Sequence, residues 1–217
     1  MNKLRIDFVS DISCPWCVIG LKSLEQAIEQ VSDVAEAELH FHPFELNPQM
    51  APEGEDIVEH LARKYGATEE QGAKTRDMIR NRGAELGFRF DMENRGRIYN
   101  TFDAHRLLHW ADLQGRQREL KMALFAAYFT RCENPSSHEV LARVAGEVGL
   151  DQSEAADVLA GGAYADEVRE QEEFFLRQGI TAVPAIIINQ RHVISGGQPA
   201  DVFERALRQI ATSQAPA

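Results

Sequence analysis

Clear strand patterns occur only near the two ends of this 217-residue chain, and a long helical stretch separates them. Near the N-terminus, Leu4, Ile6 and Phe8 alternate with polar residues, which is the period of a β-strand. A second alternating segment covers residues 36–46, and the residues between the two segments carry apolar side chains at helical spacing. Residues 3–46 therefore predict a β-α-β unit, whose strands are parallel because a helix connects them.

The middle of the chain, from about Pro52 to Gly179, consists of helical patterns that follow one another. These stretches end at glycines or other turn signals, and one begins at Thr68, a good N-cap residue. The only short strand candidate in this region is FRFDM, residues 88–92. An all-helical insertion is therefore predicted between the two strand-containing ends.

Strand character returns in residues 181–196, where an apolar run, turn residues 189–191 and the segment HVIS predict an antiparallel hairpin. A helical pattern follows over residues 199–211. The complete order predicts an α/β fold with a mixed sheet, helices on both faces and a large helical insertion. We assign residues 1–50 and 178–217 to the sheet domain and residues 51–177 to the insertion.

The charge and hydropathy of the chain limit the classes of partner and the cellular location that we expect. It carries 34 acidic and 23 basic residues, for a formal net charge of −11. Such an excess of acids disfavours nucleic acid as the main partner, because phosphate binding needs clustered Lys and Arg. No segment approaches the roughly 20 apolar residues that span a bilayer, and the N-terminus lacks the apolar core of a secretory signal. We therefore expect a cytoplasmic protein with neither nucleic-acid nor membrane partners.

Two of the three cysteines, Cys14 and Cys17, stand where the first strand gives way to the first helix, with Pro15 and Trp16 between them. If Pro15 opens the helix, Cys14 is the N-cap, and its sulfur can accept from the N–H groups of Trp16 and Cys17. The positive end of the helix dipole also favours a thiolate at Cys14. Cys17 would lie inside the first turn with a more ordinary thiol. This placement predicts an attacking and a resolving cysteine.

Two other interpretations of the pair were weighed, a metal half-site and a pair of inert core cysteines. A zinc site needs four ligands, and the third cysteine, Cys132, stands alone in the sequence. The pair His40 and His42 and the pair His105 and His109 are weak metal signals, since two ligands are not a site. We therefore expect no metal, and the roles of Cys132 and His105 stay open.

Residues outside the pair resemble a known family. CPWC after the first strand and TAVP before the third are similar to the thioredoxin superfamily, which implies a cis Val183–Pro184 bond packed beside the cysteines. The insertion, with CPWCVIG, HPFELNP, NTFDAHRLLHWA and AVPAIIINQRHVISGGQP, resembles the cytoplasmic FrnE group of DsbA-like proteins. The resemblance implies a thioredoxin fold and a thiol-disulfide oxidoreductase or isomerase. Cys14 and Cys17 would be catalytic, and substrate would contact Pro15, Trp16, Val183 and Pro184.

A related class defines the alternative function. Kappa-class glutathione transferases and 2-hydroxychromene-2-carboxylate isomerases resemble this chain in architecture, but they carry serine where Cys14 stands. Cysteine at this position, with a second cysteine nearby, favours disulfide exchange by the protein itself. The substrate would be a disulfide-containing protein or a small thiol. No cofactor is expected beyond the redox-active pair, glutathione is a candidate co-substrate, and the oligomeric state is left open.

Overall fold

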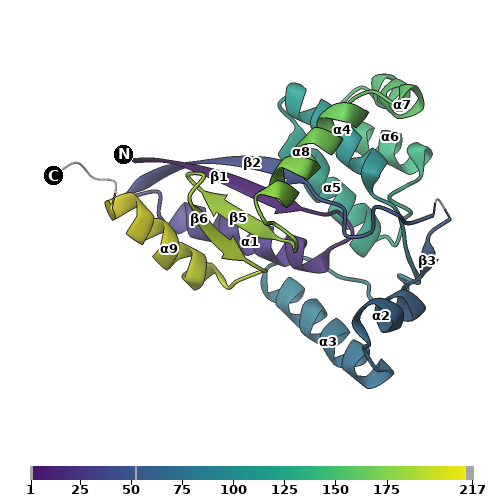
Figure 1. The fold of residues 1–217 in the computed structure, drawn as a ribbon, viewed down its shortest axis with the longest axis horizontal. Coiled ribbons are helices and arrows are strands. Elements are labelled where there is room, and N and C mark those ends of the chain that lie inside the picture. The colour runs from purple at the N-terminus through teal and green to yellow at the C-terminus, as the bar shows by residue number, and fades with distance from the viewer. Residues whose placement is uncertain (1, 52, 214–217) are drawn as a thin grey trace.

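The computed structural model describes residues 2–51 and 53–213, and its centre is a four-stranded mixed sheet. The strands lie in the order β2-β1-β5-β6 (Figure 1). β1 pairs with β2 in parallel and with β5 antiparallel, and β5 pairs antiparallel with β6. The strands are β1 (Asn2–Ser10), β2 (Ala35–Pro43), β5 (Ala185–Ile188) and β6 (His192–Ser195). The predicted parallel and antiparallel pairings are confirmed.

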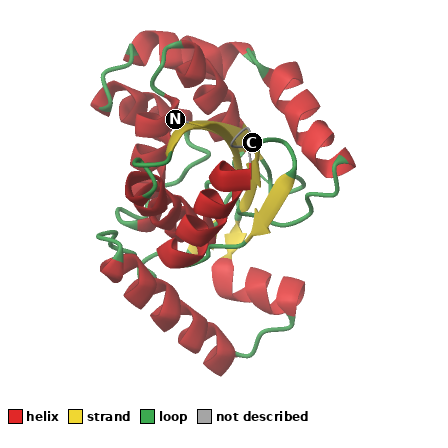
Figure 2. Ribbon diagram, turned by 90° about the vertical axis from the view of Figure 1, so that its left-hand side faces the viewer, coloured by secondary structure: helices red, strands yellow, loops and turns green. Residues whose placement is uncertain are grey.

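Helices surround this sheet, and most of them belong to the segment between β2 and β5 (Figure 2). They are α1 (Pro15–Gln30), α2 (Ile57–Tyr65), α3 (Glu69–Glu85), α4 (Phe102–Leu113), α5 (Gln117–Phe129), α6 (His138–Glu147), α7 (Gln152–Gly161), α8 (Ala165–Arg177) and α9 (Ala200–Ser213). Among the described residues, none of these helices is long and apolar enough to cross a membrane. The predicted thioredoxin fold with a helical insertion is confirmed.

Two details of the insertion differ from the sequence prediction. Residues 88–92 form no strand, because the Phe88 and Asp91 N–H groups bond to the carbonyls of Gly83 and Phe129 instead of a neighbouring strand. The insertion instead contains a short antiparallel pair, β3 (Glu55–Asp56) and β4 (Arg97–Ile98). The helical pattern of residues 153–179, which reads as one stretch in the sequence, is divided into α7 and α8, because Gly162 adopts a left-handed conformation that ends a helix.

The sheet is covered on both faces, as predicted. Leu4, Ile6 and Phe8 of β1 belong to the main core, which also contains residues of α1 and α9. Val9 points to the opposite face, where it packs in a second cluster with Phe175 of α8. The main core continues from the sheet into α4 to α7, so the division at residues 50 and 177 stays a prediction.

The pairing of β1 with β5 brings two distant segments of the chain together. Val9, near the end of β1, is the partner of Ala185, the first residue of β5. Because these strands are antiparallel, the residues that follow β1 lie beside the residues that precede β5. The junction that holds Cys14 is thereby placed next to Val183 and Pro184.

Two glycines allow α1 to approach the segment that precedes α9. A Cβ atom on Gly197 would lie 2.9 Å from the Trp16 carbonyl oxygen, and one on Gly20 would lie 3.3 Å from Gly197 Cα. Gly197→Ala is therefore expected to lower the free energy of unfolding by about 1–3 kcal/mol, because the added methyl must displace backbone. Urea denaturation of the variant measures this loss.

Gly161→Ala is the matched control, since a Cβ at this helical position meets no atom within 4 Å. Alanine there is expected to be neutral or to stabilise by up to about 1 kcal/mol. Equal midpoints for the two variants would contradict the close approach at Gly197.

Candidate functional site

The two cysteines of the CPWC segment lie in different surroundings at the start of α1. Cys14 is the N-cap residue with a side chain that is 4% exposed, and Cys17 is 0% exposed inside the first turn. Both are free thiols. The prediction that the Cys14 sulfur caps the helix is wrong: it accepts no capping hydrogen bond, and the Cys17 N–H donates to the Cys14 carbonyl oxygen at 3.1 Å. The sulfur instead meets the segment before β5.

The thiol of Cys14 donates to the carbonyl oxygen of Val183, at a sulfur–oxygen distance of 3.7 Å. The following bond, Val183–Pro184, is cis, which confirms what the family resemblance implied. Val183 is half-buried and Pro184 is buried. Val183, one of the predicted substrate-contact residues, therefore adjoins the predicted nucleophile, although 169 positions separate the two in the sequence.

Cys17 is less ordinary than the sequence predicted. Burial raises the pKa of its thiol well above the usual value, and the neighbouring Cys14 sulfur adds to this effect. A low-dielectric environment disfavours a thiolate when no cation compensates it. The Cys17 sulfur is therefore closed off from solvent and hard to ionise, as a resolving thiol would be in the resting protein.

A buried acid and a buried histidine hold the loop that carries Cys14. Asp11 accepts from the Ser13 N–H at 3.0 Å and from the Leu46 N–H at 2.7 Å, and its carbonyl accepts from the Cys14 N–H at 3.2 Å. His105 Nε2 lies 3.7 Å from the Asp11 carboxylate and 3.1 Å from the Phe44 carbonyl oxygen. Asp11 and His105 thus link the loop to the segment after β2 and to α4.

The charge on Asp11 is compatible with its burial. Burial by itself raises the pKa of this carboxyl, but the His105 side chain and the Leu46 and Ser13 N–H groups outweigh it and leave the pKa below its ordinary value. Asp11 therefore stays ionised and holds the loop at neutral pH. These contacts indicate that Asp11 supports the loop that carries Cys14.

A mainly apolar cavity of about 420 Å³ opens beside Cys14. We call it the Cys14 pocket. Its walls include Cys14 and Trp16, Leu46 after β2, Leu61 of α2, Ile79 of α3 and Met92 before β4. Pro15 also borders the cavity, whereas Val183 and Pro184 are not among the residues that border it. The structure therefore places the predicted substrate-contact residues in two groups, Pro15 and Trp16 at the pocket and Val183 and Pro184 in the segment before β5.

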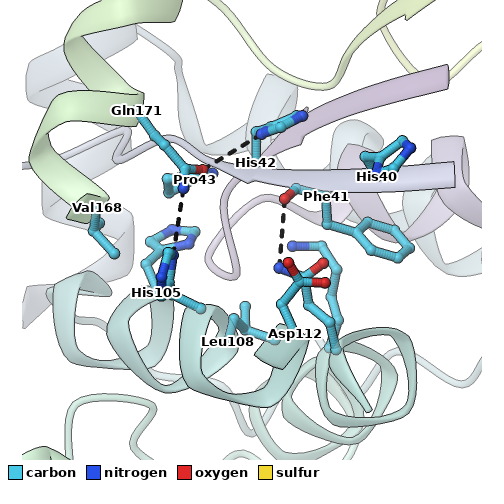
Figure 3. Close-up of a pocket in the computed structure, with 12 residues that line it drawn as sticks. His40, Phe41, His42, Pro43, His105, Leu108, Asp112, Val168 and Gln171 are labelled. Carbon is cyan, nitrogen blue, oxygen red and sulfur yellow. Dashed lines mark hydrogen bonds between the residues drawn. The ribbon is translucent and has the colours of Figure 1, made fainter. Parts of the chain in front are cut away.

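A smaller cavity of about 80 Å³ lies between β2, α4, α5 and α8 and gathers the four histidines that the sequence singled out (Figure 3). His42 and His109 both bond to the Gln171 side chain, at 3.4 and 3.3 Å. His42 also contacts Asp7 at 2.9 Å. Within residues 2–51 and 53–213, no group of three or more His, Cys, Asp or Glu side chains is arranged to hold a metal ion.

Lys121 of α5 also borders this cavity and is almost wholly buried. Its ammonium nitrogen lies 5.5 Å from the ring centre of Phe41 and 5.6 Å from that of Phe125. Burial lowers its pKa from 10.5 to about 8, and the electrostatic interactions with Cys17 and Asp11 only partly oppose this shift. Lys121 is thus a buried cation near the reactive loop that the motif search missed. The sequence feature that could have identified it is a single lysine within the apolar run of α5.

The third cysteine is separate from this site. Cys132 follows α5 with a left-handed backbone, and its thiol donates to the Asp91 carbonyl oxygen at 3.6 Å. Burial raises its pKa, and the negative charge of Asp91 adds to the shift. It is not among the residues that border the Cys14 pocket. A thiol of this kind is a poor nucleophile at neutral pH.

Comparison with known proteins agrees with this geometry. A family model described as the DSBA-like thioredoxin domain matches residues 5–208. The chain is 29% identical over 205 residues to the uncharacterized protein YwbO of Bacillus subtilis, covering 94% of this chain and 96% of that protein. The crystal structure of a probable DsbA oxidoreductase from Streptomyces coelicolor matches with a TM-score of 0.91 and 34% identity, over 99% of this chain and 92% of that one.

A structure of 2-hydroxychromene-2-carboxylate isomerase is also similar, with a TM-score of 0.71 and 13% identity, over 97% of this chain and 98% of that one. Identity at this level shows a shared fold alone. The architectural resemblance to this class, stated from the sequence, is therefore confirmed for the fold.

Proposed function

The chain belongs to the family of DSBA-like thioredoxin domains, and from this premise we propose that it is a thiol-disulfide oxidoreductase or isomerase that uses Cys14 and Cys17. The observation that carries the proposal is the unequal placement of the two sulfurs. Cys14 borders the Cys14 pocket, whereas Cys17 is fully buried with a raised pKa. Disulfide exchange needs an accessible thiol that attacks and a second thiol that resolves.

The proposed reaction proceeds in two exchange steps. The Cys14 thiolate attacks one sulfur of a substrate disulfide, whose S–S bond breaks, and the departing thiolate takes up a proton. Cys17 then loses its proton and attacks Cys14 Sγ, which releases the second half of the substrate as a thiol. Two electrons pass to the substrate and the Cys14–Cys17 disulfide forms. The reverse sequence oxidises a substrate dithiol.

The remaining sequence predictions complete the proposal. Pro15 and Trp16 would contact substrate from the Cys14 pocket, which they border. Val183 and Pro184 would contact it from the segment before β5, whose backbone would pair with an extended peptide. Within the family, the motifs quoted above favour the FrnE group and a cytoplasmic setting, with protein disulfides or small thiols as substrates.

A redox titration tests the proposed function. Equilibration in glutathione buffers of graded potential is expected to convert the protein from a dithiol to a Cys14–Cys17 disulfide, with the loss of two hydrogens. Mass spectrometry after alkylation counts the free thiols, and peptide mapping locates the bond. A midpoint above the cytosolic glutathione potential indicates an oxidase or isomerase, and one below it a reductase. Thiols that stay reduced at every potential would contradict the proposal.

A glutathione-dependent isomerase or transferase is the second candidate, because the Cys14 pocket has room for a small thiol. Such an enzyme binds glutathione saturably and needs no resolving cysteine. Its activity would therefore survive Cys17→Ser, whereas the two-step exchange would stop at the mixed disulfide.

A further inference from the structure

The Cys14 pocket contains a buried arginine that no described acid neutralises. Arg95, in the segment before β4, borders the pocket and is 7% exposed. Its guanidinium group lies over the rings of Tyr128 and Phe129, 5.0 and 4.9 Å from their centres. The Nε atom has no hydrogen-bond partner, and no acidic side chain of the described residues lies within the 4.0 Å of an ion pair.

Another buried arginine of the chain, in contrast, has both an acidic partner and hydrogen bonds. Arg106 of α4 is 3% exposed, and it pairs with Asp103 at 2.7 Å and donates to the Ala163 carbonyl oxygen at 2.8 Å. Burial of a charge is costly unless it is paired and hydrogen-bonded. The stacking of Arg95 on two aromatic rings compensates only part of this cost. An unpaired guanidinium at the wall of a cavity therefore indicates a place for an anion.

The composition of the pocket wall supports the same conclusion. A second arginine, Arg76 of α3, also borders the cavity. No Asp or Glu is among the residues that border it, although the whole chain has a formal net charge of −11. The histidine that borders the pocket, His60, already contacts Glu55, with 2.7 Å between its Nδ1 atom and the carboxylate. The pocket is thus apolar and electropositive within an anionic protein.

We propose that the Cys14 pocket binds a small carboxylate-bearing disulfide or thiol with an apolar body, and that Arg95 receives the carboxylate while the sulfur faces Cys14. This inference rests on the proposed function and names the substrate class of the same site. The volume of about 420 Å³ lies within the range of small-molecule sites. An Arg–carboxylate contact is often bidentate, so it also fixes the orientation of the sulfur.

A pair of matched disulfides tests this assignment. The probes are para-dithiodibenzoate and its diamide, which share their shape and their S–S bond and differ in charge. With Arg95→Gln, the KM for the dicarboxylate is expected to rise roughly tenfold to a hundredfold, because a charge-assisted contact is lost. The kcat for the dicarboxylate and both constants for the diamide stay near their wild-type values.

The control variant is Arg191→Gln, which removes the same charge at an exposed residue outside the Cys14 pocket. It is expected to leave kcat and KM unchanged for both probes. The diamide rate also reports whether Arg95→Gln folds. If that variant does not fold, the unaltered protein supplies the test: its KM for the dicarboxylate is expected to be at least tenfold below that for the diamide.

The outcomes separate this inference from the proposed function. Equal losses for both probes in Arg95→Gln, or no change for either, would overturn the role of Arg95, and so would equal KM values for the two probes in the wild-type protein. If the same variant instead impaired only a folded protein disulfide, the carboxylate would belong to a polypeptide and the small-molecule assignment would be wrong. A wild-type protein that reduces neither probe but forms the Cys14–Cys17 disulfide in the redox titration overturns this inference alone, whereas cysteines that stay reduced in that titration contradict the proposed function itself.

Discussion

Cys14→Ser is expected to abolish disulfide exchange, with a loss of roughly a thousandfold or more in the rate of reduction of para-dithiodibenzoate. Cys14 borders the pocket that substrate would enter, and its sulfur lies against the Val183 carbonyl oxygen. The other sulfur of the pair is fully buried, and burial raises the pKa of its thiol. Cys17 can therefore not replace Cys14 as the attacking group. Stopped-flow absorbance of the released thiol measures the rate.

Cys17→Ser is expected to behave differently, because the first exchange step remains. The variant should react once and then hold half of the substrate on Cys14 as a mixed disulfide, which mass spectrometry detects as a stoichiometric adduct. Cys132→Ser is the matched control and is expected to react at the wild-type rate, since Cys132 lies outside the Cys14 pocket.

Two results would overturn this scheme. An unchanged rate in Cys14→Ser would remove Cys14 from the reaction. Full turnover in Cys17→Ser without an adduct would favour the glutathione-dependent alternative, in which the protein needs only one thiol-binding position.

Lys121→Met is expected to stabilise the folded protein at neutral pH by up to about 3 kcal/mol. The buried ammonium group has a pKa of about 8 in place of 10.5, which corresponds to this cost of keeping the charge in the core. Methionine has a similar length and no charge, and replacing a buried charge with an apolar side chain of similar volume is often stabilising. Urea denaturation at pH 7 measures the difference between the variant and the wild-type protein.

The pH dependence of this difference follows from the direction of the shift. Between about pH 8 and pH 10.5 the unfolded chain holds the Lys121 proton more tightly than the folded protein does, so wild-type stability rises with pH. The advantage of Lys121→Met is therefore full below about pH 8 and disappears above about pH 10.5. Lys74→Met, at an exposed lysine of α3, is the control and is expected to change stability by less than about 0.5 kcal/mol. A Lys121→Met variant less stable than wild type at pH 7 would contradict the cost assigned to this charge.

Local pattern predicted much of the fold. The alternation of Leu4, Ile6 and Phe8, the break at Pro15 and the turn after Ile188 act within a few residues, and they located β1, α1 and the β5–β6 hairpin. The same reasoning failed for residues 88–92. Alternating Phe88 and Phe90 look like a strand, but Phe90 fills the space above Gly83, which only the packed helices define.

The candidate site divides in the same way. Cys14 and Cys17 could be located from the sequence, because an N-cap position and an inner helical position follow from the spacing of two residues. The hydrogen-bond partner of the Cys14 sulfur could not be predicted. The helix N–H groups are nearer in the sequence, but the sulfur contacts the Val183 carbonyl oxygen. The unpaired state of Arg95 could not be predicted either, because the loop around it contains two acids, Asp91 and Glu93, and the fold places neither within ion-pair distance of it.

The sequence by itself determined the order of the four strands of the main sheet with α1 and α9, the identity of the cysteine pair and its position at the start of α1. These depend on backbone preferences and side-chain periods that operate over one or two turns of chain. Only the tertiary structure decided what surrounds the reactive loop: the Val183 carbonyl at the Cys14 sulfur, the buried Lys121 ammonium and the cavity beside Arg95. Each arises where α3, α5 or the segment before β5 packs on the β1–α1 junction. Burial and charge at such a point depend on every element that excludes water from it.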